Sequence, residues 1–222
     1  MPTTPPADPF ATEAVDGLRG GNAASVRATA HALARVDSAA AVLLVEGISD
    51  QIALETAARC RGRDLVAERV VILPIGGAHA IGRFLTRLTP LTPRPRLVGL
   101  CDVREEEVFR RGLERSGLGA PRTRAEMARF GFEVCVDDLE DELIRALGTV
   151  RVEALLDAHG DLRLYRSFQS QPAWRDRAPE AQLWRFLRSS SRRNLRYARL
   201  LVEAAVARDT LPRPLDALLT AV

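Results

Sequence analysis

The feature that most constrains the fold is the stretch from Ala41 to Asp50, Ala-Val-Leu-Leu-Val-Glu-Gly-Ile-Ser-Asp. It begins with an uninterrupted apolar run, and such a run ending at a glycine is typical of a strand buried in a parallel sheet. The helical pattern at 51–61 follows, so Glu46 lies at the carboxyl end of the strand and Asp50 at the start of the helix. Ligands bind at that edge of open α/β sheets. Two carboxylates there indicate part of a cation site.

Three more apolar runs have this form and are followed by helical patterns, at 70–75, 96–101 and 132–136. Strands that alternate with helices at this spacing favour a parallel sheet with helices on both faces. From about residue 150 the patterns are helical only. The sequence therefore predicts an α/β protein with a parallel four-stranded sheet flanked by helices, an N-terminal helical segment and a C-terminal helical extension.

The same patterns divide the chain into four parts. We expect a disordered lead-in at 1–9, because this segment is rich in proline and threonine. N-terminal helices are expected over 10–38, the α/β core over 39–148 and the helical extension over 149–222.

The charge of the chain is unevenly distributed. All 32 basic residues are arginine and the net charge is +3, so no lysine is present to form a Schiff base or to serve as a P-loop cation. Acidic clusters at 105–107 and 137–142 contrast with the basic stretch 185–199. An acidic pocket beside a basic surface suits a metal site that handles a polyanion. The alternative interpretation is that these runs are solvated helix faces.

The cysteines and the hydropathy indicate a cytoplasmic protein. Cys60, Cys101 and Cys135 are odd in number and far apart, so they form neither a zinc motif nor a disulfide framework. No apolar run approaches the ~20 residues that span a bilayer, and no membrane association is expected.

Acidic residues follow three of the four predicted strands, and further acids lie just beyond them. The carboxyl ends of parallel strands meet at one edge of the sheet, so these side chains are expected to converge. Clustered carboxylates raise one another's pKa unless a cation neutralises them, and oxygen ligands without histidine or cysteine favour Mg²⁺ or Mn²⁺ over zinc. The acids concerned are Glu46, Asp50, Asp102, Asp137, Asp138 and Glu140.

Each of these acids also has a structural interpretation. Ser49 or Asp50 is suited to cap the helix that begins there, and Asp138 is suited to cap the next one. Asp102 is compatible with an ordinary turn after a strand. Glu46 is harder to explain in this way, because glutamate is a poor turn residue. The joint pattern favours a metal site.

Gly76, Gly77 and His79 follow the second predicted strand. Glycines at a helix N-terminus allow backbone amides to approach an anion, so we consider these three residues a candidate phosphate-binding segment. A tight turn is the alternative interpretation of the glycines, and an exposed or packed side chain is that of the histidine.

Four short motifs, taken in order, resemble the Toprim domain. They are Val-Glu-Gly-Ile-Ser-Asp at 45–50, Pro-Ile-Gly-Gly-Ala at 74–78, Val-Gly-Leu-Cys-Asp at 98–102 and Asp-Leu-Glu-Asp-Glu-Leu at 138–143. The version that they most resemble is the Toprim domain at the C-terminus of OLD-family (overcoming lysogenization defect) nucleases. The resemblance covers about residues 40–147 and, more loosely, the helices beyond.

The resemblance implies a Mg²⁺- or Mn²⁺-dependent site and assigns roles by position. Glu46, Asp102 and Arg193 are the implied catalytic residues, with Arg193 stabilising phosphate charge from the start of a late helix. The implied metal ligands are Glu46, Asp50, Asp102, Asp138 and Glu140.

Two features depart from the family pattern. Arg104 stands where the family has the second aspartate of Asp-x-Asp, with Glu105 as the only nearby replacement. OLD proteins also carry an ATPase ahead of the Toprim domain, whereas this sequence has no Gly-x-x-x-x-Gly-Lys-Ser/Thr motif. We therefore expect a stand-alone Toprim protein.

The leading hypothesis is metal-dependent phosphodiester hydrolysis by a nuclease or nickase, with nucleic acid as the partner and DNA preferred to RNA. The alternative is a catalytically weak or inactive Toprim module that binds nucleic acid or a separate ATPase subunit. A nucleotidyl transferase or primase-like activity is a third hypothesis with less support.

Overall fold

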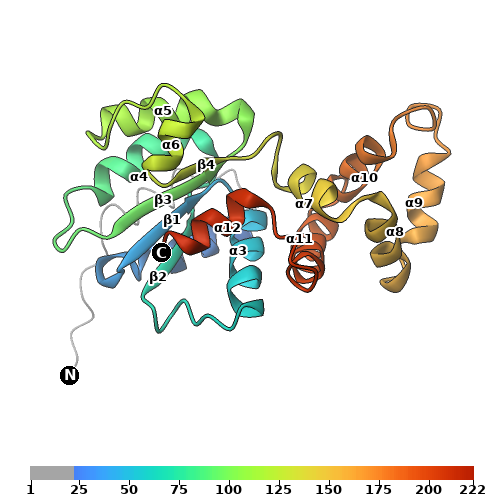
Figure 1. The fold of residues 1–222 in the computed structure, drawn as a ribbon, viewed down its shortest axis with the longest axis horizontal. Helices are drawn as coiled ribbons and strands as arrows, with labels where there is room; N and C mark the ends of the chain where they lie inside the picture. Colours follow the sequence, from blue (N-terminus) through green and yellow to red (C-terminus); the bar gives the residue numbers. More distant parts are fainter. Residues whose placement is uncertain (1–22) are drawn as a thin grey trace.

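Figure 1 shows the computed structural model, which describes residues 23–222. Its centre is a four-stranded parallel sheet with the strand order β2-β1-β3-β4. The strands are β1 (Ala41–Val45), β2 (Val70–Pro74), β3 (Arg96–Cys101) and β4 (Phe132–Val134). The predicted fold class is confirmed.

Helices connect the strands and continue beyond them. Those in the first part of the described chain are α2 (Ala23–Leu33), η1 (Val36–Ser38), α3 (Ile48–Cys60), η2 (Ala78–Ala80), α4 (Ile81–Leu88), η3 (Val103–Glu105), α5 (Glu106–Arg115), α6 (Arg124–Arg129) and α7 (Leu139–Leu147). Those that follow are α8 (Thr149–Ala158), α9 (Leu162–Gln169), α10 (Pro179–Arg188), α11 (Ser191–Val206) and α12 (Arg213–Thr220).

The N-terminal and C-terminal helical segments differ in how far they match the prediction. Helix α2 lies within the predicted N-terminal segment, whereas the rest of that segment up to residue 22 and the predicted lead-in lie outside the described residues. Helix α9 was not predicted. Its apolar residues Leu162, Tyr165 and Phe168 recur every three positions and face the core, so the helical pattern was present in the sequence.

Strand β1 lies inside the sheet, and all five of its residues are buried. Because side chains alternate along a strand, Val42 and Leu44 face one core cluster and Leu43 and Val45 face the other. Side chains of α2, α4 and α5 fill the first cluster, and α3, α11 and α12 contribute to the second. The uninterrupted apolar run of the sequence thus reflects burial on both faces.

The chain passes from β1 to β2 on one side and then to β3 on the other. The carboxyl end of β1 is therefore a topological switch point, where open α/β sheets leave a crevice. Helices α7, α10 and α11 close this end from the direction of the extension, which projects beyond the sheet in Figure 1. Glu46 follows β1 at this point.

Within residues 23–222, no helix is both long and apolar enough to cross a membrane.

Candidate functional site

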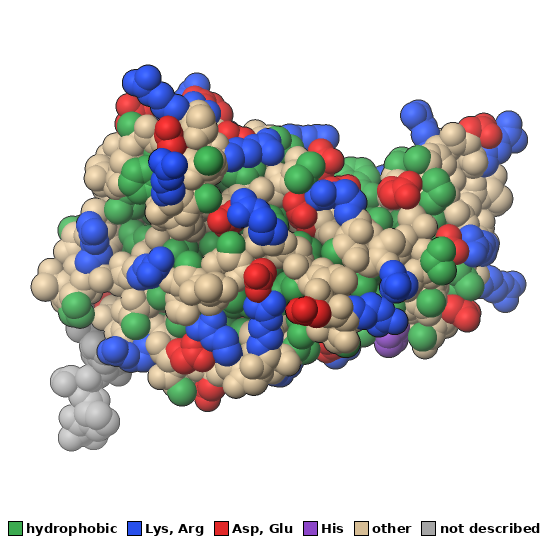
Figure 2. Space-filling model, in the orientation of Figure 1, with side chains coloured by type: hydrophobic (Ala, Val, Ile, Leu, Met, Phe, Trp, Pro, Cys, Tyr) green, Lys and Arg blue, Asp and Glu red, His purple; other side chains and the backbone are tan. Residues whose placement is uncertain are grey.

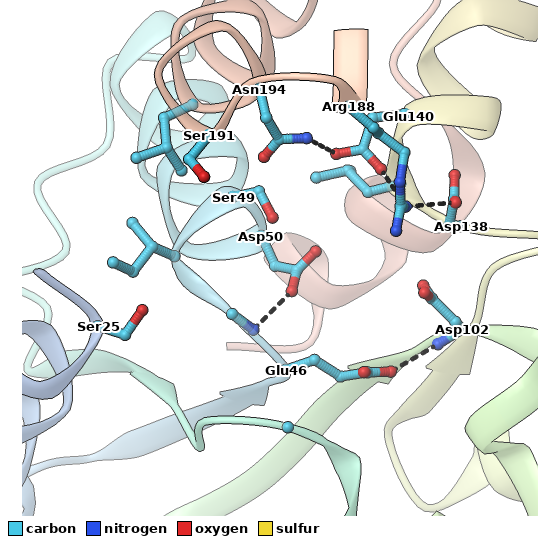
Figure 3. A pocket seen from close by; sticks show the side chains of 15 residues that line it. Ser25, Glu46, Ser49, Asp50, Asp102, Asp138, Glu140, Arg188, Ser191 and Asn194 are labelled. Carbon is cyan, nitrogen blue, oxygen red and sulfur yellow. Dashed lines mark hydrogen bonds and ion pairs between the residues drawn. The ribbon is translucent and has the colours of Figure 1, made fainter. Parts of the chain in front are cut away.

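A cavity of about 460 Å³ opens at the carboxyl ends of β1 and β3. Figure 3 shows carboxylates from three parts of the chain pointing into it, with polar side chains of α10 and α11 above them. The polar and charged side chains that line it are those of Ser25, Glu46, Ser49, Asp50, Asp102, Asp138, Glu140, Arg188, Ser191 and Asn194.

Glu46 is held through both its backbone and its side chain. Its carbonyl oxygen accepts the N–H groups of Gly76 at 3.1 Å and Gly77 at 3.0 Å. Its Oε1 accepts the N–H of Asp102 at 3.1 Å. Burial raises the pKa of Glu46, the bond from Asp102 opposes that shift, and the charge of Glu105 adds to it. These bonds connect the end of β1 to the segments that follow β2 and β3.

Asp50 lies in the first turn of α3 and does not occupy the cap position. Gly47 is the N-cap residue, and its N–H donates to Oδ2 of Asp50 at 2.9 Å. Burial raises the pKa of Asp50 to about 7, and the charges of Glu140, Glu46 and Asp138 contribute. The backward bond orients the carboxylate at the cavity floor.

Asp102 follows β3 and faces the other acids. Burial raises its pKa to about 8, and the negative charges of Glu46 and Asp50 contribute further. In the described chain, its carboxylate accepts no hydrogen bond. A proton or a metal cation relieves repulsion of this kind.

Asp138 and Glu140 are occupied by donors of the chain itself. Oδ1 of Asp138 caps α7 by accepting the N–H of Asp141 at 2.9 Å, and Oδ2 accepts Trp184 Nε1 at 2.7 Å and Arg188 at 2.6 Å. Oε1 of Glu140 accepts Asn194 Nδ2 at 2.6 Å, and Oε2 accepts Arg188 at 3.0 Å. All four carboxylate oxygens of this pair are therefore engaged.

The two groups of acids differ in their capacity for a metal. Glu46 and Asp50 each engage only one oxygen among the described residues, and Asp102 engages neither. As the side chains stand, no three His, Cys, Asp or Glu residues of the 23–222 segment are close enough together to hold one ion. The donor chemistry of Glu46, Asp50 and Asp102 fits Mg²⁺ or Mn²⁺, and ligation by all three requires rotation of carboxylates within the cavity.

Three predicted phosphate-binding residues have other partners or positions. The N–H groups of Gly76 and Gly77 both donate to Glu46, so they are not directed at an anion. This corrects the interpretation of the glycines as an amide cradle, although Gly77 does line the cavity. His79 is exposed and lines a separate groove beside α4.

Arg193 is also not placed at the cavity. Its guanidinium donates to the carbonyl of Phe186 at 3.0 Å and to Ser189 Oγ at 2.7 Å, and it lies 3.9 Å from the Phe186 ring centre. The arginine at the cavity is Arg188, which corrects the sequence-based choice. To choose between Arg188 and Arg193 from the sequence, one must know which faces of α10 and α11 are turned toward the carboxyl end of the sheet. Local sequence patterns do not define this orientation.

Trp184 and Asn194 are the other site residues that sequence reasoning missed. Arg188 lies 4.9 Å from the Trp184 ring centre, one helical turn away on α10. An aromatic residue and an arginine spaced by four positions share a helix face. This spacing was the sequence feature that could have indicated Trp184 and Arg188 as site residues. No pattern indicated the amide of Asn194.

Arg104 and Asp137 are exposed and line a neighbouring cavity of about 460 Å³. Asp102, Asp138 and Arg188 line both cavities and so lie between them. Arg104 and Asp137 therefore line the neighbouring cavity and not the carboxylate cavity.

The structure is thus a parallel α/β fold with acids at the carboxyl ends of its two inner strands. Residues 39–93 match the family model described as "Overcoming lysogenization defect protein-like, TOPRIM domain". This stretch therefore resembles an OLD-like Toprim domain, as the sequence motifs indicated. No curated protein matches the chain.

Solved structures extend the likeness over most of the chain. The C-terminal region of the Xanthomonas campestris pv. campestris OLD protein is 17% identical, with a TM-score of 0.62 over 85% of this chain and 94% of that one. The C-terminal region of the Burkholderia pseudomallei OLD protein is 16% identical, with a TM-score of 0.60 over 82% of this chain and 96% of that one. The helices beyond the sheet thus belong to the shared fold.

Proposed function

We propose that the chain hydrolyses phosphodiester bonds in nucleic acid, as a nuclease or nickase that depends on Mg²⁺ or Mn²⁺. The observation that carries the proposal is the convergence of Glu46, Asp50 and Asp102 in one cavity, with pKa values raised by burial and repulsion. Such a group is costly to keep ionised unless it binds a cation. We propose DNA as the substrate in preference to RNA.

Glu46, Asp50 and Asp102 are the residues that would hold the metal. A bound divalent ion neutralises developing charge on phosphate oxygens and lowers the pKa of bound water. Arg188 carries out the role first given to Arg193: one of its nitrogens pairs with Asp138 and Glu140, and a guanidinium has further donors for a phosphate. The acids thus hold the cation, and the arginine orients the substrate.

We further propose that this site binds a single ion. Asp138 and Glu140 match the family's second-metal pair by position, but here Arg188 provides their positive charge. Arg104 stands in place of a further carboxylate and lies outside the cavity. The pairing of Arg188 with Asp138 and Glu140 and the replacement of an aspartate by Arg104 both reduce the number of carboxylates that are available to a second ion. The Arg188 guanidinium would therefore substitute for that ion.

Nicking of supercoiled plasmid in Mn²⁺ or Mg²⁺ tests the proposal. Glu46→Gln keeps the size of the side chain but removes its charge, and should lower the rate about 100-fold or more, since loss of outer-shell partners already costs 10–100-fold. Glu55→Gln, an identical change at an exposed position of α3, should cut at the wild-type rate. Equal nicking by wild type and Glu46→Gln would refute the assignment.

The second candidate function is a non-catalytic module that binds nucleic acid or a separate ATPase subunit. The saturation of Asp138 and Glu140 by internal donors favours it. Calorimetric titration with Mn²⁺ separates the two functions. No uptake at millimolar Mn²⁺ would support the module, whereas uptake that Asp102→Asn abolishes would support the hydrolase.

A further inference from the structure

A second concave surface lies beside the carboxylate cavity and differs from it in charge. It is a hollow of about 550 Å³ between α4 and the end of α5, which we call the α4–α5 groove. Its lining includes His79, Gly82, Arg83, Thr86 and Arg115, and none of the lining residues within 23–222 is acidic. Ligand sites of nucleotide size have volumes of about 300–1,000 Å³, so the hollow has room for a phosphate and its sugar.

The groove and the cavity are connected through one short segment. Gly77 lines the carboxylate cavity, and His79, two residues further along, lines the groove. Two residues span at most ~7 Å. The positive charge of His79 also acts on Glu46, where it opposes the raised pKa. A nucleic-acid strand with one phosphate in the cavity would therefore have a neighbouring part of its backbone close to the groove.

Two arginines of the groove form no ion pair with the described residues, although Arg83 lies 5.5 Å from the Phe84 ring centre. Arg110 and Arg111 on α5 pair with Glu106 or Glu107 of the same helix, but Arg115 at its end forms no ion pair there. Arg83 also forms none, and its Nε is buried without a hydrogen-bond acceptor. A buried donor that is left unsatisfied destabilises the folded protein. Rotation of the Arg83 side chain toward an anionic oxygen in the groove would provide the missing acceptor.

Glycines create the space. A Cβ atom at Gly82 would lie 3.9 Å from the Cα of Gly112, so the backbones of α4 and α5 approach closely. The absence of a side chain at Gly82 leaves the hollow open above this contact. A basic, glycine-lined hollow is a feature suited to a phosphate, since phosphates need donors and close approach rather than apolar walls.

We propose that the α4–α5 groove binds a backbone phosphate of the nucleic acid whose scissile bond lies in the carboxylate cavity. This inference rests on the proposed function for its substrate class. Among the described residues, no aromatic side chain lines the groove. Bases therefore have no stacking partner among these residues, and the contact would be independent of sequence. The groove would hold the strand in register with the acids, and Arg83 and Arg115 would position it rather than take part in the chemistry.

Fluorescence anisotropy with a labelled DNA duplex, in EDTA and over a range of salt concentrations, tests the proposal without metal chemistry. Arg83→Gln combined with Arg115→Gln should weaken binding about tenfold or more. The slope of log K against log salt should fall by about 1.8, because each lost phosphate contact contributes about 0.9. Arg115→Gln alone, at an exposed position, should produce about half of that change even if the double variant folds poorly.

The matched control removes the same charge elsewhere. Arg111→Gln combined with Arg175→Gln removes two arginines that are 64% exposed in their side chains and are paired with neighbouring acids. This control should bind DNA with wild-type affinity and slope. If both double variants lost DNA affinity equally, the net charge of the protein alone would explain the loss, and the groove assignment would be overturned.

The remaining outcomes separate this proposal from the proposed function. Arginine-dependent binding without any nicking would support the groove and count against hydrolysis. Nicking with binding that does not depend on Arg83 and Arg115 would support hydrolysis and overturn the groove. Thermal stabilisation by inorganic phosphate that depends on these arginines, without DNA binding by wild type, would identify a free-phosphate site and overturn the nucleic-acid assignment.

Discussion

At the scale of single residues, the metal-free site should make folding depend on pH. Asp50 and Asp102 have a reference pKa of 3.8, and the folded protein raises these values to about 7 and about 8. Between the reference pKa of 3.8 and the raised pKa values of the folded protein, folding is therefore accompanied by the uptake of protons. The stabilisation is complete below about pH 4 and is lost as the pH rises through 8.

The expected result is a lower melting temperature at pH 8.5 than at pH 5.5 in EDTA, by about 2–4 °C for each kcal/mol lost. Mn²⁺ should stabilise more at pH 8.5, because protons compete less with the ion there. Asp102→Asn should flatten the pH profile, since the amide does not titrate. A wild-type profile that rises between these pH values would contradict the assigned direction. Differential scanning calorimetry makes the measurement.

Arg188 provides a second test at this scale. Arg188→Met should release Asp138 and Glu140 from their ion pairs, which have distances of 2.6 and 3.0 Å. We expect the wild type to bind one Mn²⁺ per chain and the variant to bind two, as counted by calorimetry. Without metal the variant should lose about 1–3 kcal/mol of stability, because buried acids then lack a partner.

A matched change is Arg185→Met on the same helix, at an exposed position. It should leave the metal count at one. Two ions in the wild type, or one in Arg188→Met, would exclude the substitution of a metal by the guanidinium.

At the scale of elements, the strands were predictable because their chemistry is local. Apolar runs marked all four strands and acids follow three of them, and parallel pairing then brought Glu46 and Asp102 to one edge. The position of Arg188 over Asp138 depends instead on how α10 packs against α7. That geometry is set by contacts distant in sequence. The family resemblance assigned the phosphate-stabilising role to Arg193 by position, whereas the arginine that lines the cavity is Arg188.

Glycines show how closely these elements pack. A Cβ at Gly99 in β3 would lie 2.8 Å from two ring atoms of Phe132 and 3.1 Å from the carbonyl oxygen of Leu44. Gly99→Ala should therefore destabilise the protein by about 1–3 kcal/mol through overpacking. Gly82→Ala on α4 meets only an ordinary contact at 3.9 Å and should be neutral or slightly stabilising, because alanine favours helix. Urea denaturation compares the two, and equal stabilities would contradict the close β3–β4 packing.

At the scale of the whole molecule, the helical extension shares a core with the sheet. One cluster joins Leu43 of β1 to Leu156, Leu183 and Leu187 of the extension. Figure 2 shows arginine and acidic side chains interspersed over both parts, so on this face of the molecule the sheet and the extension do not differ in charge. The sequence predicted a sheet core and a helical extension, but the change from strands to helices could not show that the extension completes one face of the sheet.

This shared core predicts a single unfolding transition. Both tryptophans, Trp174 and Trp184, lie in the extension, so their fluorescence reports on it, whereas far-UV circular dichroism reports on the whole chain. Leu187 is fully buried, and Leu187→Ala should cost about 2–5 kcal/mol. The two melting curves should coincide and shift together, because removing a side chain from one core weakens everything packed around it. Leu164→Ala, at a position that is 55% exposed, should leave both unchanged. A fluorescence transition that moves alone would show that the extension unfolds independently, and the closure of the site by α10 and α11 would then be a separate equilibrium.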